Sequence, residues 1–367
     1  MSIGSIEISN IMVFQNGRGK DGKNHKTDKQ EGNKSSGGCF RLEFCEGINV
    51  LIGENGVGKT TILKMIYVAA RRSRGHTGGE GIRYLAQAFS HNLKDHDILK
   101  HEGGSGDDCY YKVSDGEHCF EDHLNRDVAL EEEGWTKLNI PSVFIPTTEM
   151  LSHSKGFLAL NQKYYMPFDD TQVDIIVNAS LPETREISAS MLGVLEKISD
   201  VIAGTVVQEE DVFYLLKKDG RKVEFSLEAE GLRKLGLLWK LIRNGLLESG
   251  SILLWDEPEA NLNPELYPLV AEILLELERN GVQIFVATHS YNFAKYLEIR
   301  RISKAQVRFH NLYKESTGPA DQTQTVTSGY TDDYEMVKSQ SADRMEELWP
   351  NHIMIADNKL LDEVYEQ

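Results

Sequence analysis

Long apolar runs are missing from this chain. No segment of the 367 residues approaches the roughly 18 consecutive apolar residues that a membrane-spanning helix needs. The first ten residues, MSIGSIEISN, also lack the basic start and the apolar core of a secretion signal. We therefore expect neither a membrane protein nor a secreted one, and we expect a cytoplasmic location.

Cysteine and positive charge are scarce as well. The four cysteines form no CxxC pair, which is typical of reduced thiols in a cytosol: Cys39, Cys45, Cys109 and Cys119. Lysine and arginine number 40 against 57 acidic residues, a net charge of −17. This balance excludes a protein that coats nucleic acid over its whole surface, although it leaves room for a local basic groove.

The remaining composition is that of a globular chain, with 40% hydrophobic and 26% charged residues. Residues 16–38 hold almost no large apolar side chain, so we predict a mobile loop there. Asp-Gly pairs predict two hairpin turns, at 115–116 and 219–220. Apolar runs predict strands at 6–14, 142–146, 251–255 and 282–288, and helices at 231–247 and 266–280. The alternation after residue 230 predicts a parallel sheet with helices on its faces.

The stretch GENGVGKT, residues 53–60, follows an apolar strand and opens a helix, as the GxxxxGK[ST] pattern requires. Its glycines let backbone N–H groups surround phosphate oxygens at a helix start that favours anions. Lys59 is expected to reach the β- and γ-phosphates, and the Thr60 hydroxyl to coordinate Mg²⁺. We predict nucleotide contacts at Asn55, Gly56, Val57, Gly58, Lys59, Thr60 and Thr61.

Two carboxylates follow the apolar strand SILLW, where they are costly unless a cation or polar ligand uses them. Asp256 is predicted to hold Mg²⁺, and Glu257 to orient or deprotonate the attacking water. His289 ends the next strand, in IFVATHS. A lone histidine there is more often a bystander, but its order after the other two motifs favours a catalytic role.

Together, GENGVGKT, ILLWDEPEANLNP and ATHS resemble the Walker A, Walker B with D-loop, and switch-histidine motifs of ABC-type ATPases of the SMC, RecF and OLD group. The resemblance covers residues 1–70 and 205–300. It implies an α/β P-loop ATPase head with a mixed or parallel sheet flanked by helices, with β-hairpins and an inserted α/β lid region. It further implies ATP and Mg²⁺ as cofactors, and a D-loop at a dimer interface formed by Asn261, Leu262 and Asn263. Transporter domains usually read DEPTSALD here, which argues against transport.

The family's signature motif, SxG followed by polar and basic residues, begins a helix that contacts the γ-phosphate held by the other subunit. Matching SLEAEGLRKLG on its glycine puts Gly231 in that place and Ala229 where serine is usual, with Arg233 and Lys234 as the basic residues. The helix dipole survives, whereas a hydroxyl contact worth about 1.5–3 kcal/mol is lost. The alternative is a plain core helix, because its apolar residues share one face: Leu232, Leu235, Leu238 and Ile242.

Several weaker candidates stay open. For the family's Q-loop we consider Gln87 and the turn 147–149. Phe14 is a candidate for an adenine contact, although an aromatic residue near the end of a strand more often belongs to the core. Soft metal ligands occur at Cys109, His118, Cys119 and His123. In a hairpin the neighbouring His118 and Cys119 point to opposite faces, so we favour strand packing over zinc. We consider nucleic acid as a partner for Arg71, Arg72, Arg74 and the lysines of 17–34. Such residues more commonly form a solvated charged surface, and we favour that interpretation.

We divide the chain into an N-terminal lobe (1–74), an inserted lid or partner-docking region (75–205), a C-terminal lobe (206–315) and an extension (316–367). The expected function is a Mg²⁺-dependent ATPase with composite sites in a homodimer, whose ATP cycle controls an effector nuclease or toxin from the same operon. The segment FIPTTEMLSHSKGFLAL resembles stand-alone ATPases of bacterial anti-phage defence operons of the Septu or PARIS kind. The alternative is a RecF- or SMC-like repair ATPase that binds DNA. A nucleotide-locked scaffold with slow hydrolysis also stays open.

Overall fold

The computed structural model describes residues 2–15, 39–75, 81–90, 99–101, 109–124, 130–131, 134–164, 166–316 and 335–365. The predicted loop 16–38 and the lysines of 17–34 lie outside these residues. Among the described helices, none combines the length and the apolar character needed to cross a membrane.

A six-stranded sheet forms the centre of the molecule, in the order β14-β13-β3-β12-β11-β7. Four pairs are parallel and β13–β14 is antiparallel, so the sheet is mixed. The strands are β3 (Ile48–Gly53), β7 (Ser142–Ile145), β11 (Ile252–Asp256), β12 (Gln283–Thr288), β13 (Val307–Ser316) and β14 (Glu335–Ala342). The predicted strands at 142–146, 251–255 and 282–288 are therefore confirmed, as is the parallel pairing predicted for the last two.

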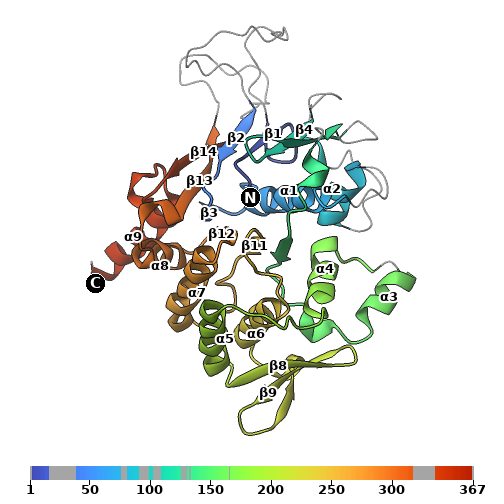
Figure 1. Ribbon diagram of the computed structural model, residues 1–367. Helices are drawn as coiled ribbons and strands as arrows, with labels where there is room; N and C mark the ends of the chain where they lie inside the picture. Colours follow the sequence, from blue (N-terminus) through green and yellow to red (C-terminus); the bar gives the residue numbers. More distant parts are fainter. Residues whose placement is uncertain are drawn as a thin grey trace, which may run out of the picture.

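Both faces of the central sheet are buried, which explains why its strands read as continuous apolar runs. Along β11, Ile252 and Leu254 pack into one hydrophobic cluster, and Leu253 and Trp255 into another on the opposite face. The sheet thus separates two cores, one under the N-terminal lobe and one under the later helices (Figure 1).

The N-terminal core is closed by an antiparallel sheet in the order β2-β1-β4-β5-β6. Its strands are β1 (Ser5–Ser9), β2 (Phe40–Glu43), β4 (Tyr110–Ser114), β5 (Cys119–His123) and β6 (Leu130–Glu131). A second small sheet contains β8 (Gly204–Glu209), β9 (Val212–Lys217) and β10 (Lys222–Glu224). Both predicted Asp-Gly hairpins are confirmed, as β4–β5 and β9–β10. The predicted strand 6–14 ends early, because Asn10 and Met12 adopt φ of 49° and 51° and turn the chain.

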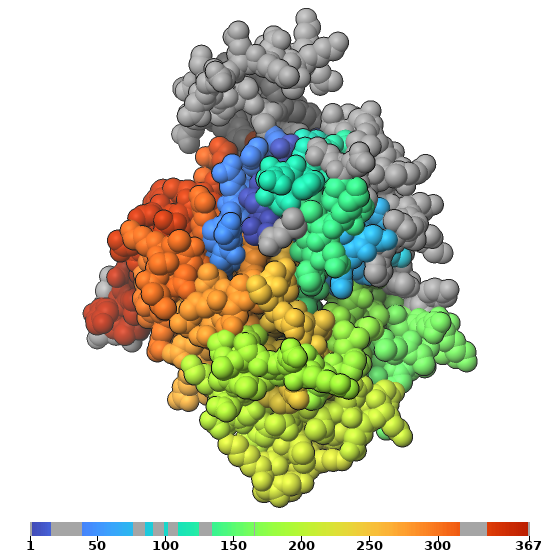
Figure 2. All heavy atoms as spheres, viewed as in Figure 1, coloured from blue at the N-terminus to red at the C-terminus, as the bar shows by residue number. Residues whose placement is uncertain are grey.

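Helices cover the two faces unequally (Figure 1). Next to the antiparallel sheet lie α1 (Lys59–Arg72) and α2 (Gly81–Phe89). The other helices are α3 (Phe157–Tyr164), α4 (Asp170–Ala179), α5 (Ala189–Val201), α6 (Glu230–Arg243), α7 (Tyr267–Arg279), α8 (Tyr291–Arg300) and α9 (His352–Tyr365). Residues 150–225, coloured from green to yellow, form the lower part of the surface in Figure 2.

The segment 75–205 contributes strands to the antiparallel sheet and to the central sheet, and it also contributes helices. Its β4 pairs with β1, and its β7 forms the edge of the central sheet beside β11. The division of the chain into four regions stays a prediction.

Candidate functional site

The loop between β3 and α1 wraps around the start of α1. Gly58 precedes α1 with φ of 93°, and a Cβ there would lie 2.5 Å from the Phe14 ring, so glycine is required twice over. Lys59 lies across the loop and donates hydrogen bonds to the carbonyl oxygens of Gly53 and Glu54, at 2.7 and 2.8 Å. Burial lowers the pKa of Lys59, and nearby carboxylates partly counter this effect. An ammonium held by carbonyl oxygens in this way is available to a phosphate.

Phe14, considered as an adenine contact, is 1% exposed and packs beneath this loop. It belongs to the N-terminal hydrophobic core and lies 4.6 Å from the Phe40 ring, centroid to centroid. The more common alternative, a core aromatic residue, is therefore what the structure has.

Thr60 and Asp256 are brought together from the start of α1 and the end of β11. The Thr60 hydroxyl donates to Asp256 Oδ2 at 2.9 Å. Burial raises the pKa of Asp256, and hydrogen bonds with Thr60 and with Thr147 at the end of β7 partly counter it. Two hard oxygen donors fit the ligand preference of Mg²⁺, and among the described residues the buried carboxylate has no basic partner at hydrogen-bond distance. The arrangement also places Thr147, from one of the two Q-loop candidates, beside Asp256.

Glu257 and His289 face each other across the ends of β11 and β12. The distance from His289 Nδ1 to Glu257 Oε1 is 3.3 Å. Glu257 adopts φ of 49°, a left-handed conformation that costs about 1–3 kcal/mol in a non-glycine residue. Its N–H donates to the carbonyl of Ala287 at 2.9 Å, which fixes the turn against β12. This geometry places a carboxylate and an imidazole in direct contact at the ends of β11 and β12.

A second glutamate belongs to the same cluster and was not predicted from the sequence. Glu259 is 4% exposed, and its Oε1 accepts from Thr288 Oγ1 at 2.5 Å and from the His289 N–H at 3.3 Å. Burial raises the pKa of Glu259, and the hydrogen bond from Thr288 counters it. The sequence contains a signal for this residue, because the motif DEPE has a carboxylate where the transporter motif DEPT has a hydroxyl.

The predicted signature helix is α6, with Ala229 as its N-cap and without a side-chain cap. A Cβ at Gly231 would lie 3.0 Å from the Asn261 carbonyl oxygen, so this glycine lets α6 approach its own D-loop. Lys234 is 2% exposed and donates to the carbonyl oxygens of Glu257 and Ala260, at 3.3 and 2.8 Å. The start of α6 and the D-loop of one chain therefore form a single surface.

The D-loop residues divide into exposed and buried ones. Asn261 is exposed with φ of 59°, while Leu262 is 6% exposed. Asn263 accepts from the N–H of Glu265 at 3.1 Å and so begins the short turn before α7. Asn263 is exposed like Asn261, so both asparagines are available to another molecule.

The remaining candidates have other partners. Arg71 forms ion pairs with Asp170 and Asp174 of α4, at 3.3 and 2.8 Å, which engages it within the fold. Gln87 lies on α2 and is partly buried. Within the described residues, no group of three or more metal-ligating side chains is placed to hold a metal ion. Cys109 and Cys119 are buried at the hairpin, and neither forms a disulfide.

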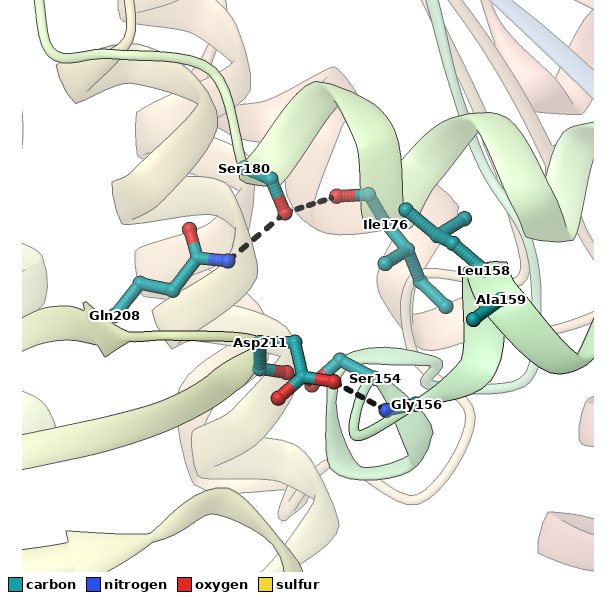
Figure 3. A pocket seen from close by; sticks show the side chains of 8 residues that line it. All are labelled: Ser154, Gly156, Leu158, Ala159, Ile176, Ser180, Gln208 and Asp211. Carbon is teal, nitrogen blue, oxygen red and sulfur yellow. Dashed lines mark hydrogen bonds between the residues drawn. The ribbon is translucent and has the colours of Figure 1, made fainter.

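A separate cavity of about 210 Å³ lies among α3, the end of α4 and the β8–β9 turn (Figure 3). Its polar groups already have partners, since Gln208 donates to Ser180, Ser180 to the Ile176 carbonyl, and the Gly156 N–H to Asp211. None of the predicted nucleotide-site residues lines it. The predicted nucleotide-site residues lie in the loops at the ends of β3, β11 and β12, away from this cavity.

The fold and these loops define a P-loop nucleotide-binding protein. Two family models match, one described as "AAA domain" over residues 5–143 and one as "AAA domain, putative AbiEii toxin, Type IV TA system" over residues 167–294. Together with the motifs and the mixed sheet, these matches support an ABC-type P-loop ATPase, and the likeness to SMC heads is one of fold.

Similar proteins include a sequence relative and solved structures of SMC heads. The L-cystine import ATP-binding protein TcyN of Bacillus subtilis (strain 168) is 28% identical over 142 residues, and this match spans 33% of the chain and 55% of that relative, about half its length. The structure of an SMC head bound to the C-winged helix domain of ScpA has a TM-score of 0.53 at 12% identity. The match covers 95% of this chain and 100% of that chain. The SMC head domain from Thermotoga maritima has a TM-score of 0.45 at 14% identity, covering 93% and 99%.

Proposed function

We propose that the protein is a Mg²⁺-dependent ATPase that uses two composite sites in a homodimer as an ATP-controlled switch. The observation that carries the proposal is that Thr60 at the start of α1 meets Asp256 at the end of β11, next to Glu257. The Thr60 hydroxyl and the Asp256 carboxylate are 2.9 Å apart. Backbone N–H groups of residues 55–61 and Lys59 bind the phosphates, and Thr60 and Asp256 hold Mg²⁺. When bound, Mg²⁺ neutralises charge on the β- and γ-phosphates.

Glu257 orients and deprotonates the water that attacks the γ-phosphate, and His289 donates to the phosphate oxygens. Their side chains lie 3.3 Å apart. Burial lowers the pKa of Lys59 and the Glu257 carboxylate partly counters this effect, which supports a location of Glu257 near the phosphate loop. Burial of the Asp256 carboxylate strengthens its interaction with a cation, because the surroundings are less polar than water.

The other half of each site comes from a second copy of the chain. Gly231 and Asn261 lie on one surface, formed by the start of α6 and the D-loop, and Asn261 is exposed. The first N–H groups of a helix have no partner within the helix and favour anions. ATP held by one subunit bridges to this surface of the other, so binding closes the dimer and hydrolysis opens it.

The closed state acts on a partner effector, a nuclease or toxin, in bacterial anti-phage defence. Support comes from the resemblance of the segment 144–160 to ATPases of defence operons, and from the toxin–antitoxin wording of the model that matches 167–294. The structural neighbour bound to ScpA supports partner binding by a head of this fold. A DNA-binding repair function has less support, because Arg71 is engaged with α4.

Glu257→Gln tests the hydrolytic role. The variant should bind ATP, lose at least about 100-fold in turnover, and accumulate as an ATP-bound dimer in size-exclusion chromatography with light scattering. Glu265→Gln changes an exposed glutamate after the same loop and should behave as the native protein. Lys59→Ala should remain monomeric with ATP. Native turnover in Glu257→Gln would exclude it as the base.

A further inference from the structure

Glu259 has a side chain that the hydrolytic scheme does not use. Its Oε1 accepts two hydrogen bonds, from Thr288 and from the His289 backbone. Its Oε2 is buried without a hydrogen-bond partner among the described residues. A buried acceptor without a partner destabilises the fold, so a residue of this kind calls for a role outside packing.

The contacts of Glu259 fix the turn between β12 and α8. Thr288 Oγ1 donates to Glu259 and also accepts from the Ser290 N–H at 3.0 Å. Ser290 in turn caps α8 by accepting from the N–H of Phe293 at 3.2 Å. One carboxylate oxygen thus holds the segment from which the imidazole of His289 projects.

The imidazole itself has little packing to orient it, since 49% of the His289 side chain is exposed. Its Nδ1 lies 3.3 Å from Glu257 Oε1 and 3.9 Å from Glu259 Oε1. The orientation toward Glu257 therefore depends on the backbone at 288–290, and this backbone depends on Glu259.

We propose that Glu259 is a positioning residue that keeps His289 directed at Glu257, and that it acts on hydrolysis through His289. The inference rests on the proposed ATPase function. The acceptor geometry of Oε1 carries the effect, because both of its donors can also bond to a carboxamide oxygen.

The test is a double-mutant cycle on ATP hydrolysis, with Glu259→Ala and Glu259→Gln each made in the native protein and in His289→Ala. Glu259→Ala should lower kcat about 10- to 100-fold with little change in KM, and Glu259→Gln should restore most of it. In His289→Ala, the Glu259→Ala change should cost no further activity. Equal losses in both backgrounds, or a Gln variant no better than Ala, would overturn the proposal.

A second measurement does not depend on turnover. With ¹³C-labelled histidine, the imidazole resonance of His289 is assigned by its disappearance in His289→Ala. It should move in Glu259→Ala and in Thr288→Val, which removes the hydroxyl donor with little change in shape, and stay in place in Glu259→Gln. An unmoved resonance in Glu259→Ala and Thr288→Val would overturn the inference. Native protein without hydrolysis above the Lys59→Ala level would overturn the proposed function alone.

Discussion

At the residue scale, the phosphate loop depends on glycines for two separable reasons. Gly56 and Gly58 both adopt left-handed conformations, with φ of 79° and 93°. A Cβ at Gly56 would meet nothing within 4 Å, whereas one at Gly58 would lie 2.5 Å from Phe14. The first position therefore requires backbone freedom, and the second also requires space.

We predict that Gly58→Ala lowers the free energy of unfolding more than Gly56→Ala does. Backbone strain alone should cost Gly56→Ala about 1–2 kcal/mol, and displacement of the buried ring should add about 1–3 kcal/mol in Gly58→Ala. Urea unfolding of both variants without nucleotide provides the comparison. Equal losses would show that Phe14 yields without cost.

Glu259 also makes a prediction for pH. Burial raises its pKa above the ordinary value of 4.5, so the folded state binds a proton more tightly than the unfolded chain. This contribution to stability is fully present below 4.5 and is lost as pH rises through the folded pKa. Glu259→Gln should therefore gain stability relative to the native protein as pH rises from 4.5 toward neutral, in unfolding curves measured at each pH. A difference that does not change with pH would contradict the raised pKa.

At the scale of elements, α4 is joined to the phosphate-loop helix by charged pairs along one face. Lys64 and Asp169 lie 2.8 Å apart with side chains only 11% and 13% exposed. Tyr67 donates to Asp174 at 2.6 Å, and Arg71 pairs with the same carboxylate. At its other end, α4 accepts hydrogen bonds from Asn244, which follows α6. α4 thus connects α1, which begins at the phosphate loop, with α6, the predicted signature helix.

We predict that Asp169→Asn destabilises the protein by about 1–3 kcal/mol, because it leaves Lys64 largely buried without its counter-charge. Asparagine is also a good N-cap, so the start of α4 itself should persist. Asp200→Asn is the control, since it breaks a pair with side chains 65% and 74% exposed and should cost less than about 0.5 kcal/mol. Thermal unfolding of the two variants decides the question, and equal shifts would mean that the buried pair adds nothing.

The elements show what the sequence could predict. Asp-Gly turns, apolar strands and the phosphate loop depend on neighbouring residues, so they were predictable from local pattern. Other features depend on contacts between distant segments. Lys234 matched a basic position of the signature, yet the structure buries it under its own D-loop. Phe14 follows a strand and proves to be core, because Gly58 leaves room for its ring. Glu259 needed β12 beside β11 before its partners could be identified.

At the scale of the whole molecule, the start of α6 and the D-loop form one surface, and the phosphate loop lies on another part of the chain. Gly231 lies against Asn261, so a side chain introduced at 231 disturbs both elements of that surface at once. In the proposed dimer, damage to either surface inactivates a different half of each composite site. A head-to-tail dimer turns this separation into a measurable complementation.

We predict that Lys59→Ala and Gly231→Asp are each inactive alone and partly active when mixed. A mixed dimer joins the intact phosphate loop of one subunit to the intact α6 and D-loop surface of the other, which leaves one competent site of two. A mixed dimer should therefore recover about half of native turnover per dimer. Differently tagged subunits and tandem purification verify the mixed dimer. Verified mixed dimers without activity would contradict a shared site, and a variant active alone would show that each chain completes its own.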